Sequence, residues 1–447
     1  MYVCGPTVYD VPHLGHGRSA LVYDVLRRWL EARGIAVRHV SNVTDIDDKI
    51  IQRGIEEHRS AREVAEENEQ AWWDAMDRLG VLRPTVAPHA TAYVDQMIEA
   101  ISRMVEKNAA YVTPFGVYFA SEEVADYGLL ARQSLASLKM GARVGQDPTK
   151  RSPVDFVLWK PARPGEPAWS SPWGRGRPGW HTECVVMSLD LLGDGFDVHS
   201  GGLDLQFPHH ENERAQAAAL GRPFARHWMH HAFVELGGEK MSKSSGNYTS
   251  LGDLLANADE RALRLLVLQS HYRSPLEVTA DTIAAAEASL SRLDAMARRL
   301  CTGDRTVTVP AALVAPSREV GPAGPGDVDQ RVERFISRME DDLDTPGAIS
   351  EVFDLVRAAN AAAEGGEHAL GSSMASVASS LLAAVGLPLK GSGGDVDAPS
   401  AELLARREAA RRDRNFALAD SLRDELLARG WIVEDLPGGS QLRRSHQ

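Results

Sequence analysis

The spacing of apolar residues near the start of the chain predicts a strand, a helix and a second strand. Residues 1–4 form a short apolar run that ends at Gly5-Pro6. Between residues 19 and 33 the apolar side chains recur every three or four positions, which predicts a helix with one buried face. Gly34 ends this helix, and residues 35–43 have the composition of a second strand. We therefore expect an α/β domain with a doubly wound parallel sheet, whose ligands bind at the carboxyl ends of the strands.

The rest of the chain alternates between helical and strand-rich stretches. Two stretches rich in Gly and Pro, residues 302–327 and 386–399, predict linkers. In chain order, the other stretches are charged helices at 51–108, short strands and turns at 109–163, a return of the α/β pattern at about 179–248, helices at 251–300, Ala-rich helices at 328–385 and a small tail domain. Because the strands and turns interrupt the α/β pattern, we expect them to form an insertion.

Length and composition exclude several classes of protein. The chain has 447 residues, which predicts two to four domains at about 100–200 residues per domain. It contains 43% hydrophobic and 25% charged residues, the balance of a globular protein rather than of a disordered chain. No run of about 18 uncharged apolar residues would span a membrane. Residues 1–6 lack the features of a secretory signal, and Cys4, Cys184 and Cys301 are too few for a disulfide framework. We therefore expect a cytoplasmic protein with free thiols.

The charge of the chain is unevenly distributed. The net charge is −13, which argues against a protein that coats nucleic acid. Residues 401–447, however, carry nine Arg against eight Asp and Glu, so the tail is electropositive relative to the rest. Because interactions with phosphates are screened beyond about 8–10 Å, one less acidic face is enough to bind RNA.

The first motif with side chains suited to ligand binding or catalysis lies between the first predicted strand and helix. In Pro12-His13-Leu14-Gly15-His16-Gly17, two imidazoles flank a glycine near the positive end of a helix. Gly15 and Gly17 allow close approach of the backbone, and the helix N-terminus favours phosphate. The imidazoles can donate hydrogen bonds to phosphate oxygens as charge develops there. The alternative is a polar loop in which both histidines are satisfied by their neighbours.

The second motif is Glu239-Lys240-Met241-Ser242-Lys243-Ser244-Ser245-Gly246-Asn247. Lys240 and Lys243 are separated by small residues in a loop that could deliver two ammonium groups to phosphates. A solvated basic turn is the alternative for this loop alone. Chance does not readily place both motifs in one α/β region, so together they indicate nucleotide chemistry.

A third constellation consists of Cys4, Cys184, His209 and Glu213. His209 and Glu213 are four residues apart in a predicted helix and therefore share one face. Two thiolates, an imidazole and a carboxylate are ligand types that zinc accepts. Two buried structural cysteines are the alternative, because free Cys is commonly buried. His210 lies three residues before Glu213, so the sequence alone does not choose between the two histidines.

Two further polar segments follow predicted strands. The segment Thr44–Lys49 contains three neighbouring carboxylates that could bind a metal or a polar substrate. A turn with helix-capping aspartates accounts for them as well. His199-Ser200-Gly201-Gly202, with Asp204 beyond it, has the composition of a loop that lines a cleft. A plain Gly turn is the alternative there.

These motifs identify a resemblance to the cysteinyl-tRNA synthetase family of class I aminoacyl-tRNA synthetases, along nearly the whole chain. The two nucleotide-binding signatures are shared across class I, whereas the Cys-containing start, WHTEC and HHENE are specific to the cysteine branch. The segments that carry the match are MYVCGPTVYD, PHLGHGRS, NVTDIDDKI, DFVLWK, GRPGWHTEC, FPHHENE, EKMSKSSGN, DDLDTP and RRDRNFALADSLRDELLARGWIVEDLPGG.

The resemblance implies a role for each candidate residue. One zinc ion per chain would be held by Cys4, Cys184, His209 and Glu213. The catalytic residues would be His13, His16, Lys240 and Lys243. ATP, with magnesium, would be bound by Gly15, His16 and Lys243. The substrate-binding residues would be Thr7, Trp180 and His199.

The resemblance also implies the order of the domains. A Rossmann-like catalytic domain would be followed by α-helical domains and a small anticodon-binding domain. The expected boundaries are 1–250 for the catalytic domain with an insertion at about 85–175, 251–301 for a helical region that contacts the tRNA stem, 302–327 for a linker, 328–385 for a tRNA-binding helical bundle, 386–399 for a second linker and 400–447 for the anticodon-binding domain.

The implied reaction joins L-cysteine and ATP into cysteinyl-adenylate and then transfers cysteine to the terminal adenosine of tRNA(Cys). The resemblance also implies that the protein is a monomer. A zinc site suits this substrate, because an apolar pocket separates near-isosteres such as cysteine and serine by only about 1–3 kcal/mol. A soft metal prefers a thiolate over an alcohol and lowers the pKa of the thiol. The substrate sulfur would then be an added zinc ligand, and no editing domain would be needed.

Two other functions fit parts of the sequence. Some ligases of mycothiol synthesis resemble this family but join cysteine to an amino-sugar inositol. They lack the C-terminal module and tend to lose the acidic position of Glu213, both of which this chain has. An inactive synthetase-like protein that binds RNA is the other alternative, and the intact pairs His13/His16 and Lys240/Lys243 argue against it.

Overall fold

The computed structural model describes most of the chain in two compact units. One unit comprises residues 1–31 and 35–282, and the other comprises 32–34 and 283–447. The described residues are 1–134, 137–138, 149–236, 239–240, 250–301, 328–390, 397–436 and 439–444. The expected linker 302–327 and residues 391–396 of the second expected linker lie outside them. Within the described part of the chain, no helix has the length and apolar character needed to cross a membrane.

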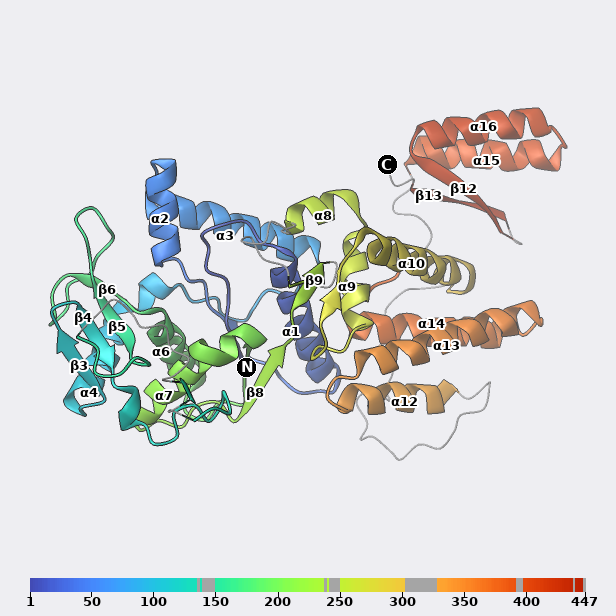
Figure 1. Cartoon of the computed structure of the whole chain (residues 1–447). Coiled ribbons are helices and arrows are strands. Elements are labelled where there is room, and N and C mark those ends of the chain that lie inside the picture. Colours follow the sequence, from blue (N-terminus) through green and yellow to red (C-terminus); the bar gives the residue numbers. More distant parts are fainter. Residues whose placement is uncertain are drawn as a thin grey trace. The chain divides into compact units, whose positions relative to one another are not determined.

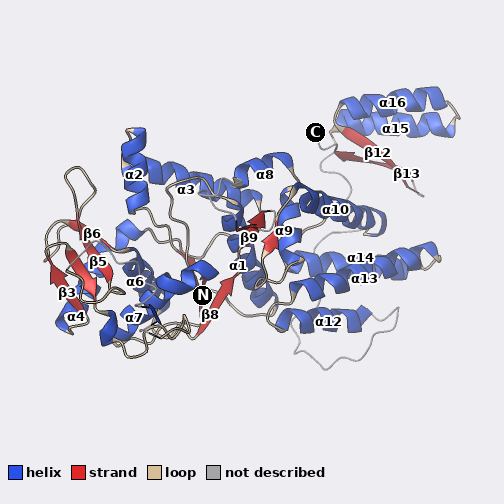
Figure 2. Ribbon diagram, viewed as in Figure 1, coloured by secondary structure: helices blue, strands red, loops and turns tan. Residues whose placement is uncertain are grey.

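The first unit contains a parallel sheet of four short strands, of which β8 is labelled in Figures 1 and 2. They are ordered β2 (Val40–Ser41), β1 (Tyr2–Val3), β7 (Val198–Gly202) and β8 (His227–His231). All three pairings are parallel, which confirms the predicted doubly wound α/β class. The strand expected at 35–43 is shorter than predicted, because only Val40 and Ser41 pair with β1.

Helix α1 (Leu14–Ala32) follows β1 and begins five residues before the predicted start at 19. Gly15 and Gly17 are weak helix formers, so propensity alone does not reveal this first turn. Packing explains the early start, because Leu14 is 1% exposed and a Cβ on Gly17 would lie 3.1 Å from Leu251 Cδ1. The helix N-terminus therefore coincides with the first histidine motif.

Two charged helices follow β2 and two more helices cover the sheet. They are α2 (Asp48–Glu57), α3 (Ala61–Arg78), α4 (Val94–Glu106), which follows the 3₁₀ turn Ala90–Tyr93, and α6 (Trp180–Leu192). A buried cluster joins the sheet to these helices through Tyr2, Val40, Met97 and Met187. Its side chains come from β1, β2, α4 and α6, so this core fixes the strand ends that carry the site.

Residues 110–178 contain the strands of an antiparallel sheet, the last of which lies just beyond the insertion expected at about 85–175. Its strands are ordered β3 (Ala110–Thr113), β4 (Gly116–Phe119), β5 (Phe156–Pro161) and β6 (Gly176–Pro178). The 3₁₀ turn Ser121–Glu123 follows β4. Ile101 of α4 and Ala215 of α7 (Glu211–Leu220) pack into one core with Phe119 and Trp159 of this sheet. The insertion is thus packed against the helix that carries the HHENE segment.

A small sheet contains the first two residues of the lysine motif. Its order is β10 (Glu239–Lys240), β9 (Val234–Leu236) and β11 (Leu276–Glu277). Helices α8 (Leu251–Asn257) and α9 (Glu260–Leu268) lie between β10 and β11 in the chain. The helical pattern predicted at 251–300 did not include β11, because a strand of two residues leaves no periodic signal.

The second unit is mainly helical. Its elements are most of α10 (Ala280–Leu300), then α12 (Val328–Glu340), α13 (Thr345–Glu364), α14 (His368–Ala384), α15 (Ala398–Arg412), α16 (Phe416–Ala428) and the hairpin of β12 (Trp431–Leu436) and β13 (Gly439–Arg444). Three helices fill the stretch where the Ala-rich pattern predicts a bundle. In the tail, Leu403, Leu426, Trp431 and Leu442 form a separate buried cluster.

Candidate active site and metal centre

The two histidines of the first motif form a stacked pair at the start of α1. Their ring centroids are 3.7 Å apart. The backbone N–H of His13 donates to Nδ1 of His16 at 3.3 Å, and the backbone N–H of His16 donates to Nδ1 of His13 at 3.4 Å. Burial lowers the pKa of His13 to about 4 and that of His16 to about 3, where the charge of His13 adds to the effect. Both rings are therefore neutral at pH 7, and with Nδ1 accepting, each proton is on Nε2.

A cavity of about 580 Å³ opens beside this pair. It lies at the carboxyl ends of three parallel strands, because Cys4 follows β1, Gly202 ends β7 and His231 ends β8. This position confirms the prediction made from the α/β pattern. The candidate residues that line the cavity are Cys4, Thr7, His13, Gly15, His16 and Trp180.

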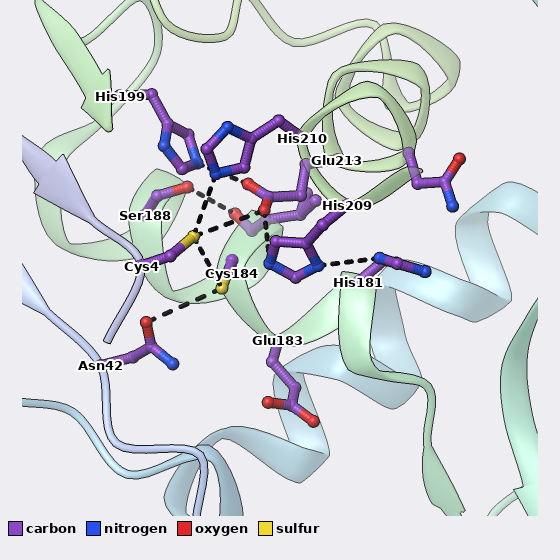
Figure 3. Close-up of polar contacts among 12 residues, drawn as sticks. Cys4, Asn42, His181, Glu183, Cys184, Ser188, His199, His209, His210 and Glu213 are labelled. Atoms are coloured by element: carbon purple, nitrogen blue, oxygen red, sulfur yellow. Dashed lines mark hydrogen bonds and ion pairs between the residues drawn. The ribbon is translucent and has the colours of Figure 1, made fainter. Parts of the chain in front are cut away.

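The structure brings the third constellation together from elements far apart in the sequence (Figure 3). Cys4 follows β1, Cys184 is on α6, and His209 lies in the irregular π-helical turn Gln206–His210 just before α7, which carries Glu213. The Cys4 and Cys184 sulfurs are 3.8 Å apart, and Cys4 Sγ is 3.7 Å from Glu213 Oε1. His209 Nε2 and Glu213 Oε1 are 2.8 Å apart, as expected for residues on one helical face.

The arrangement of these four groups fits a metal ion. Their ligand atoms all lie within 4.8 Å of one another. Two sulfurs that are each about 2.3 Å from a tetrahedral zinc ion lie about 3.8 Å apart, which is the separation of Cys4 and Cys184. Cys184, His209 and Glu213 are at most 1% exposed. The site is therefore shielded from bulk water on the side of these three residues.

A second group of potential ligands shares two of these residues. Cys4, His199, His210 and Glu213 also have ligand atoms within 4.8 Å of one another. His210 Nε2 is 3.3 Å from Cys4 Sγ, and His199 Nε2 is 2.5 Å from Glu213 Oε2. The geometry therefore accommodates either histidine of the HHENE segment. The group with His209 contains both thiols, which makes it the better match to a zinc site.

Electrostatic coupling prepares the cluster to bind a cation. The hydrogen bond from Cys4 lowers the pKa of Cys184 to about 6 despite burial, whereas burial and this bond raise the pKa of Cys4. Burial opposes the ionised form of Glu213, but His199 and His209 lower its pKa. Burial also opposes charge on His209, but Glu213 and Cys184 raise its pKa to about 10. The Cys184 thiolate and the Glu213 carboxylate are thus available as anionic ligands, whereas His209 is protonated at pH 7 in the metal-free cluster and would have to release its proton to bind a metal.

Trp180 connects the cluster with the cavity. Its ring stacks on His209 with centroids 4.0 Å apart, and its side chain is 38% exposed and lines the cavity. His181 supports His209 from another side, with the two Nδ1 atoms 2.9 Å apart. Figure 3 shows Glu183 pointing away from the two thiols, and it accepts a hydrogen bond from Thr44 instead.

His199 does not lie where the resemblance suggested. It is completely buried and does not line the cavity, and its Nε2 lies 2.5 Å from Glu213 Oε2. Lys240 is placed through its backbone in β10, and Lys243 lies outside the described residues. The structure thus brings together the four expected zinc ligands and the histidine pair, and leaves the positions of the two lysine side chains as predictions.

Several cavity residues were not predicted to line it. Lys49 belongs to the polar segment 44–49, whose carboxylates drew attention first, and its ammonium group lies 4.9 Å from the Tyr9 ring centroid. Trp72 of α3 contacts His16 edge-on, with ring centroids 5.5 Å apart. A tryptophan in an amphipathic helix is an ordinary core residue, so no sequence signal could have identified Trp72.

Comparison with known families assigns most of the chain. A family described as tRNA synthetases class I (C) catalytic domain matches residues 1–288. A DALR domain matches residues 334–390, and a cysteinyl-tRNA ligase anticodon binding domain matches residues 394–443.

Individual relatives cover the whole chain. A cysteine–tRNA ligase from Alkalilimnicola ehrlichii is 45% identical over 99% of this chain and 95% of its own length. The cysteine–tRNA ligase from Caldicellulosiruptor saccharolyticus is 41% identical over the same shares. Among solved structures, Mycobacterium tuberculosis methionyl-tRNA synthetase bound by methionyl-adenylate superposes with a TM-score of 0.59 at 15% identity, covering 86% of this chain and 89% of that one. At this identity the superposition shows a shared fold.

Proposed function

Because the chain belongs to the cysteinyl-tRNA synthetase family of class I aminoacyl-tRNA synthetases, we propose that it is a cysteine–tRNA ligase. It would activate L-cysteine with ATP and transfer the cysteinyl group to the terminal adenosine of tRNA(Cys). The observation that carries the proposal is the convergence of Cys4, Cys184, His209 and Glu213 beside a cavity lined by His13 and His16. An amino-acid site and a phosphate site thus adjoin each other.

We assign one zinc ion to Cys4, Cys184, His209 and Glu213. A zinc ion bound there would supply a soft Lewis acid that binds a substrate thiolate in preference to a hydroxyl. Trp180, which stacks on His209 and lines the cavity, would cover the amino acid next to this centre. Because serine lacks the sulfur, this selection would exceed the about 1–3 kcal/mol available from an apolar pocket.

The histidine pair would act on the phosphates. During activation, a carboxylate oxygen of cysteine forms a bond to the α-phosphorus of ATP, and the bond to the bridging oxygen breaks to release pyrophosphate. The neutral rings of His13 and His16 would donate from Nε2 to the phosphate oxygens, on which charge increases. Lys240 and Lys243 would neutralise the pyrophosphate, with magnesium bound to ATP.

The second unit would bind tRNA. Its helices α12–α14 lie where the DALR family matches, and α15, α16 and the hairpin β12–β13 lie where the anticodon-binding family matches. We therefore assign tRNA binding to helices α12–α14, stem contacts to residues 251–301 and anticodon recognition to residues 400–447. We also propose a monomer that works in the cytoplasm, consistent with the three free cysteines.

The test uses the full-length chain in two assays. Cysteine-dependent exchange of pyrophosphate into ATP measures activation, and charging of tRNA(Cys) with labelled cysteine measures transfer. The proposal predicts both activities. Exchange without charging, together with transfer of cysteine to an amino-sugar inositol, would establish the alternative ligase, and absence of exchange at full zinc occupancy would refute the proposal.

A further inference from the structure

Within the described part of the chain, the hydrogen bonds of the buried Arg18 all go to backbone carbonyls, and the nearby charge of Glu235 also favours its charged form. Arg18 lies in α1, two residues after His16, and it is 1% exposed. Its guanidinium donates to the backbone carbonyl of Phe233 at 2.6 Å and to that of Ser274 at 2.5 Å. Longer hydrogen bonds reach the carbonyls of Tyr272 at 3.3 Å and His271 at 3.4 Å. Burial lowers its pKa to about 10, so it remains charged at neutral pH.

The four carbonyls belong to two segments that support the lysine motif. Phe233 directly precedes β9, which pairs with β10, where Lys240 lies. His271–Ser274 precede β11, which pairs with the other edge of β9. The backbone N–H of Leu276 also donates to the Phe233 carbonyl at 3.0 Å. Arg18 therefore connects the base of the small sheet with the helix that begins at the histidine pair.

The other side of the lysine motif is attached to the same region. The backbone N–H of Leu251, the first residue of α8, donates to the carbonyl of Pro12 at 2.9 Å. Ser250 and His13 form an isolated β-bridge. Residues 12–18 thus hold both described flanks of residues 241–249, and Arg18 is the side chain that holds the N-terminal flank.

We propose that Arg18 is a positioning residue that fixes β9 and β11, the described strands next to the lysine motif, relative to the turn that carries His13 and His16. This inference rests on the proposed function for its catalytic consequence. A planar guanidinium with five donors can serve several carbonyls at once, whereas an ammonium group is a point charge with three donors. Arg18→Lys keeps the charge but cannot reproduce this set of contacts. Because small displacements of reacting groups cost large factors in rate, we expect kcat for exchange to fall about tenfold or more.

Arg264 provides a matched control for a general loss of stability. It is also 1% exposed, it lies on α9 in the same unit, and it donates to the carbonyls of Leu79 and Gly80, each at 3.0 Å. It pairs with the buried Asp24 and does not contact either flank of the lysine motif through these bonds. Arg264→Lys therefore disturbs a buried arginine of similar type whose bonds to Asp24, Leu79 and Gly80 do not involve the small sheet.

The experiment compares the wild-type chain, R18K and R264K in exchange kinetics, zinc content and amide hydrogen exchange. We expect R18K to lower kcat, to leave the KM for cysteine within about twofold and the zinc content unchanged, and to accelerate hydrogen exchange at 234–236 and 276–278. R264K should leave kcat and these amides near their wild-type values. Equal kinetic losses in both variants, or an R18K protein with wild-type kcat, would overturn the proposal.

Hydrogen exchange separates this inference from the proposed function. If the wild-type chain does not activate cysteine, the proposed function fails, and the amides at 234–236 still report whether Arg18 anchors the small sheet. Unchanged protection of these amides in R18K would refute the anchoring role even if the wild-type chain is fully active.

Discussion

Cys4 and Cys184 are 180 positions apart in the chain, yet their sulfurs approach to 3.8 Å. Neither residue belongs to a Cys-x-x-Cys pair, so their meeting depends on the parallel sheet and on α6 packing against it. Each thiol alone would be an ordinary buried cysteine. With His209 and Glu213 beside them, they form a donor set whose ligand atoms are close enough to share one metal ion.

Cys184→Ser tests the metal assignment at the residue scale. Because a hydroxyl is a poor ligand for zinc compared with a thiolate, we expect this variant to lose most of its zinc. Cys301→Ser is the matched control, since Cys301 lies in the other unit near Ser379. Metal analysis of the purified proteins should find wild-type zinc in C301S. Full zinc in C184S would contradict the assignment.

The pKa of His16 predicts how stability changes with pH. Burial lowers this pKa from 6.5 to about 3 in the folded chain. Between these values the unfolded chain binds a proton that the folded chain does not, so the free energy of unfolding falls as the pH falls below 6.5. One such group contributes about 1.4 kcal/mol per pH unit.

His16→Gln should therefore make the pH dependence shallower. Urea unfolding monitored by tryptophan fluorescence between pH 6.5 and pH 4.5 measures the slope for both proteins. If the two slopes are equal, the pKa of His16 is the same in the folded and the unfolded chain, and its lowering by burial is wrong.

The sequence predicted the residue types of the site better than their arrangement. Helical spacing placed His209 and Glu213 on one face, which the 2.8 Å contact confirms. It could not choose between His209 and His210, because His210 lies in the same turn and its Nε2 comes within 3.3 Å of Cys4 Sγ. The family resemblance assigned His199 to the substrate pocket, whereas this residue is fully buried, contacts Glu213 and does not line the cavity. Side-chain direction depends on tertiary packing, which periodicity does not encode.

At the scale of elements, the ends of the parallel strands position the site. Strand β1 has two residues, and Gly5 follows Cys4 immediately after it. The backbone N–H of Gly5 donates to Asn42 Oδ1 at 2.9 Å. A Cβ at Gly5 would lie 1.6 Å from the backbone oxygen of Asn42, so only glycine allows this approach.

Gly5→Ala should displace Cys4 through the backbone. Since the clash is with backbone and not with a flexible side chain, we expect a loss of about 1–3 kcal/mol in the free energy of unfolding and a lower zinc content. Gly252→Ala is the control, because the nearest atom to its Cβ would be Ser250 Oγ at 3.8 Å. Thermal unfolding and metal analysis give both quantities. Unchanged zinc in a destabilised G5A would show that Cys4 does not need this strand end.

Elements with clear periodicity were predictable and short ones were not. The structure has helices α12–α14 where the Ala-rich pattern predicted helices, and it has β3, β4 and most of β5 where short strands and turns were predicted. The strands β2 and β11 each contain two residues, and their pairing comes from neighbours rather than from local sequence. The early start of α1 was hidden because glycines occupy its first turn, where Leu14 and Gly17 pack tightly.

At the scale of the whole molecule, activation and tRNA recognition are assigned to different parts of the chain. The residues around the 580 Å³ cavity all belong to the unit with residues 1–31 and 35–282. The tail has its own buried cluster around Trp431. Each part therefore has an independent core, which makes a deletion of the tail a clean test.

Deletion of residues 397–447 should impair charging of tRNA(Cys) and spare pyrophosphate exchange. The cut falls at Asp397, the N-cap of α15, so the removed segment contains the whole tail cluster. Parallel assays of the full-length and shortened chains measure both activities. A matching loss of exchange would show that the tail supports the catalytic site and that the division of labour is wrong.

Selection of cysteine through its sulfur is tested most directly by titrating metal out of the active enzyme. Samples with graded zinc content, prepared with a chelator, are assayed for exchange with cysteine, alone and with serine as competitor. We predict that cysteine-dependent exchange falls in proportion to bound zinc and returns when zinc is restored, while serine neither reacts nor competes. Metal-free protein that still activates cysteine and rejects serine would contradict the selection of cysteine by a bound zinc ion.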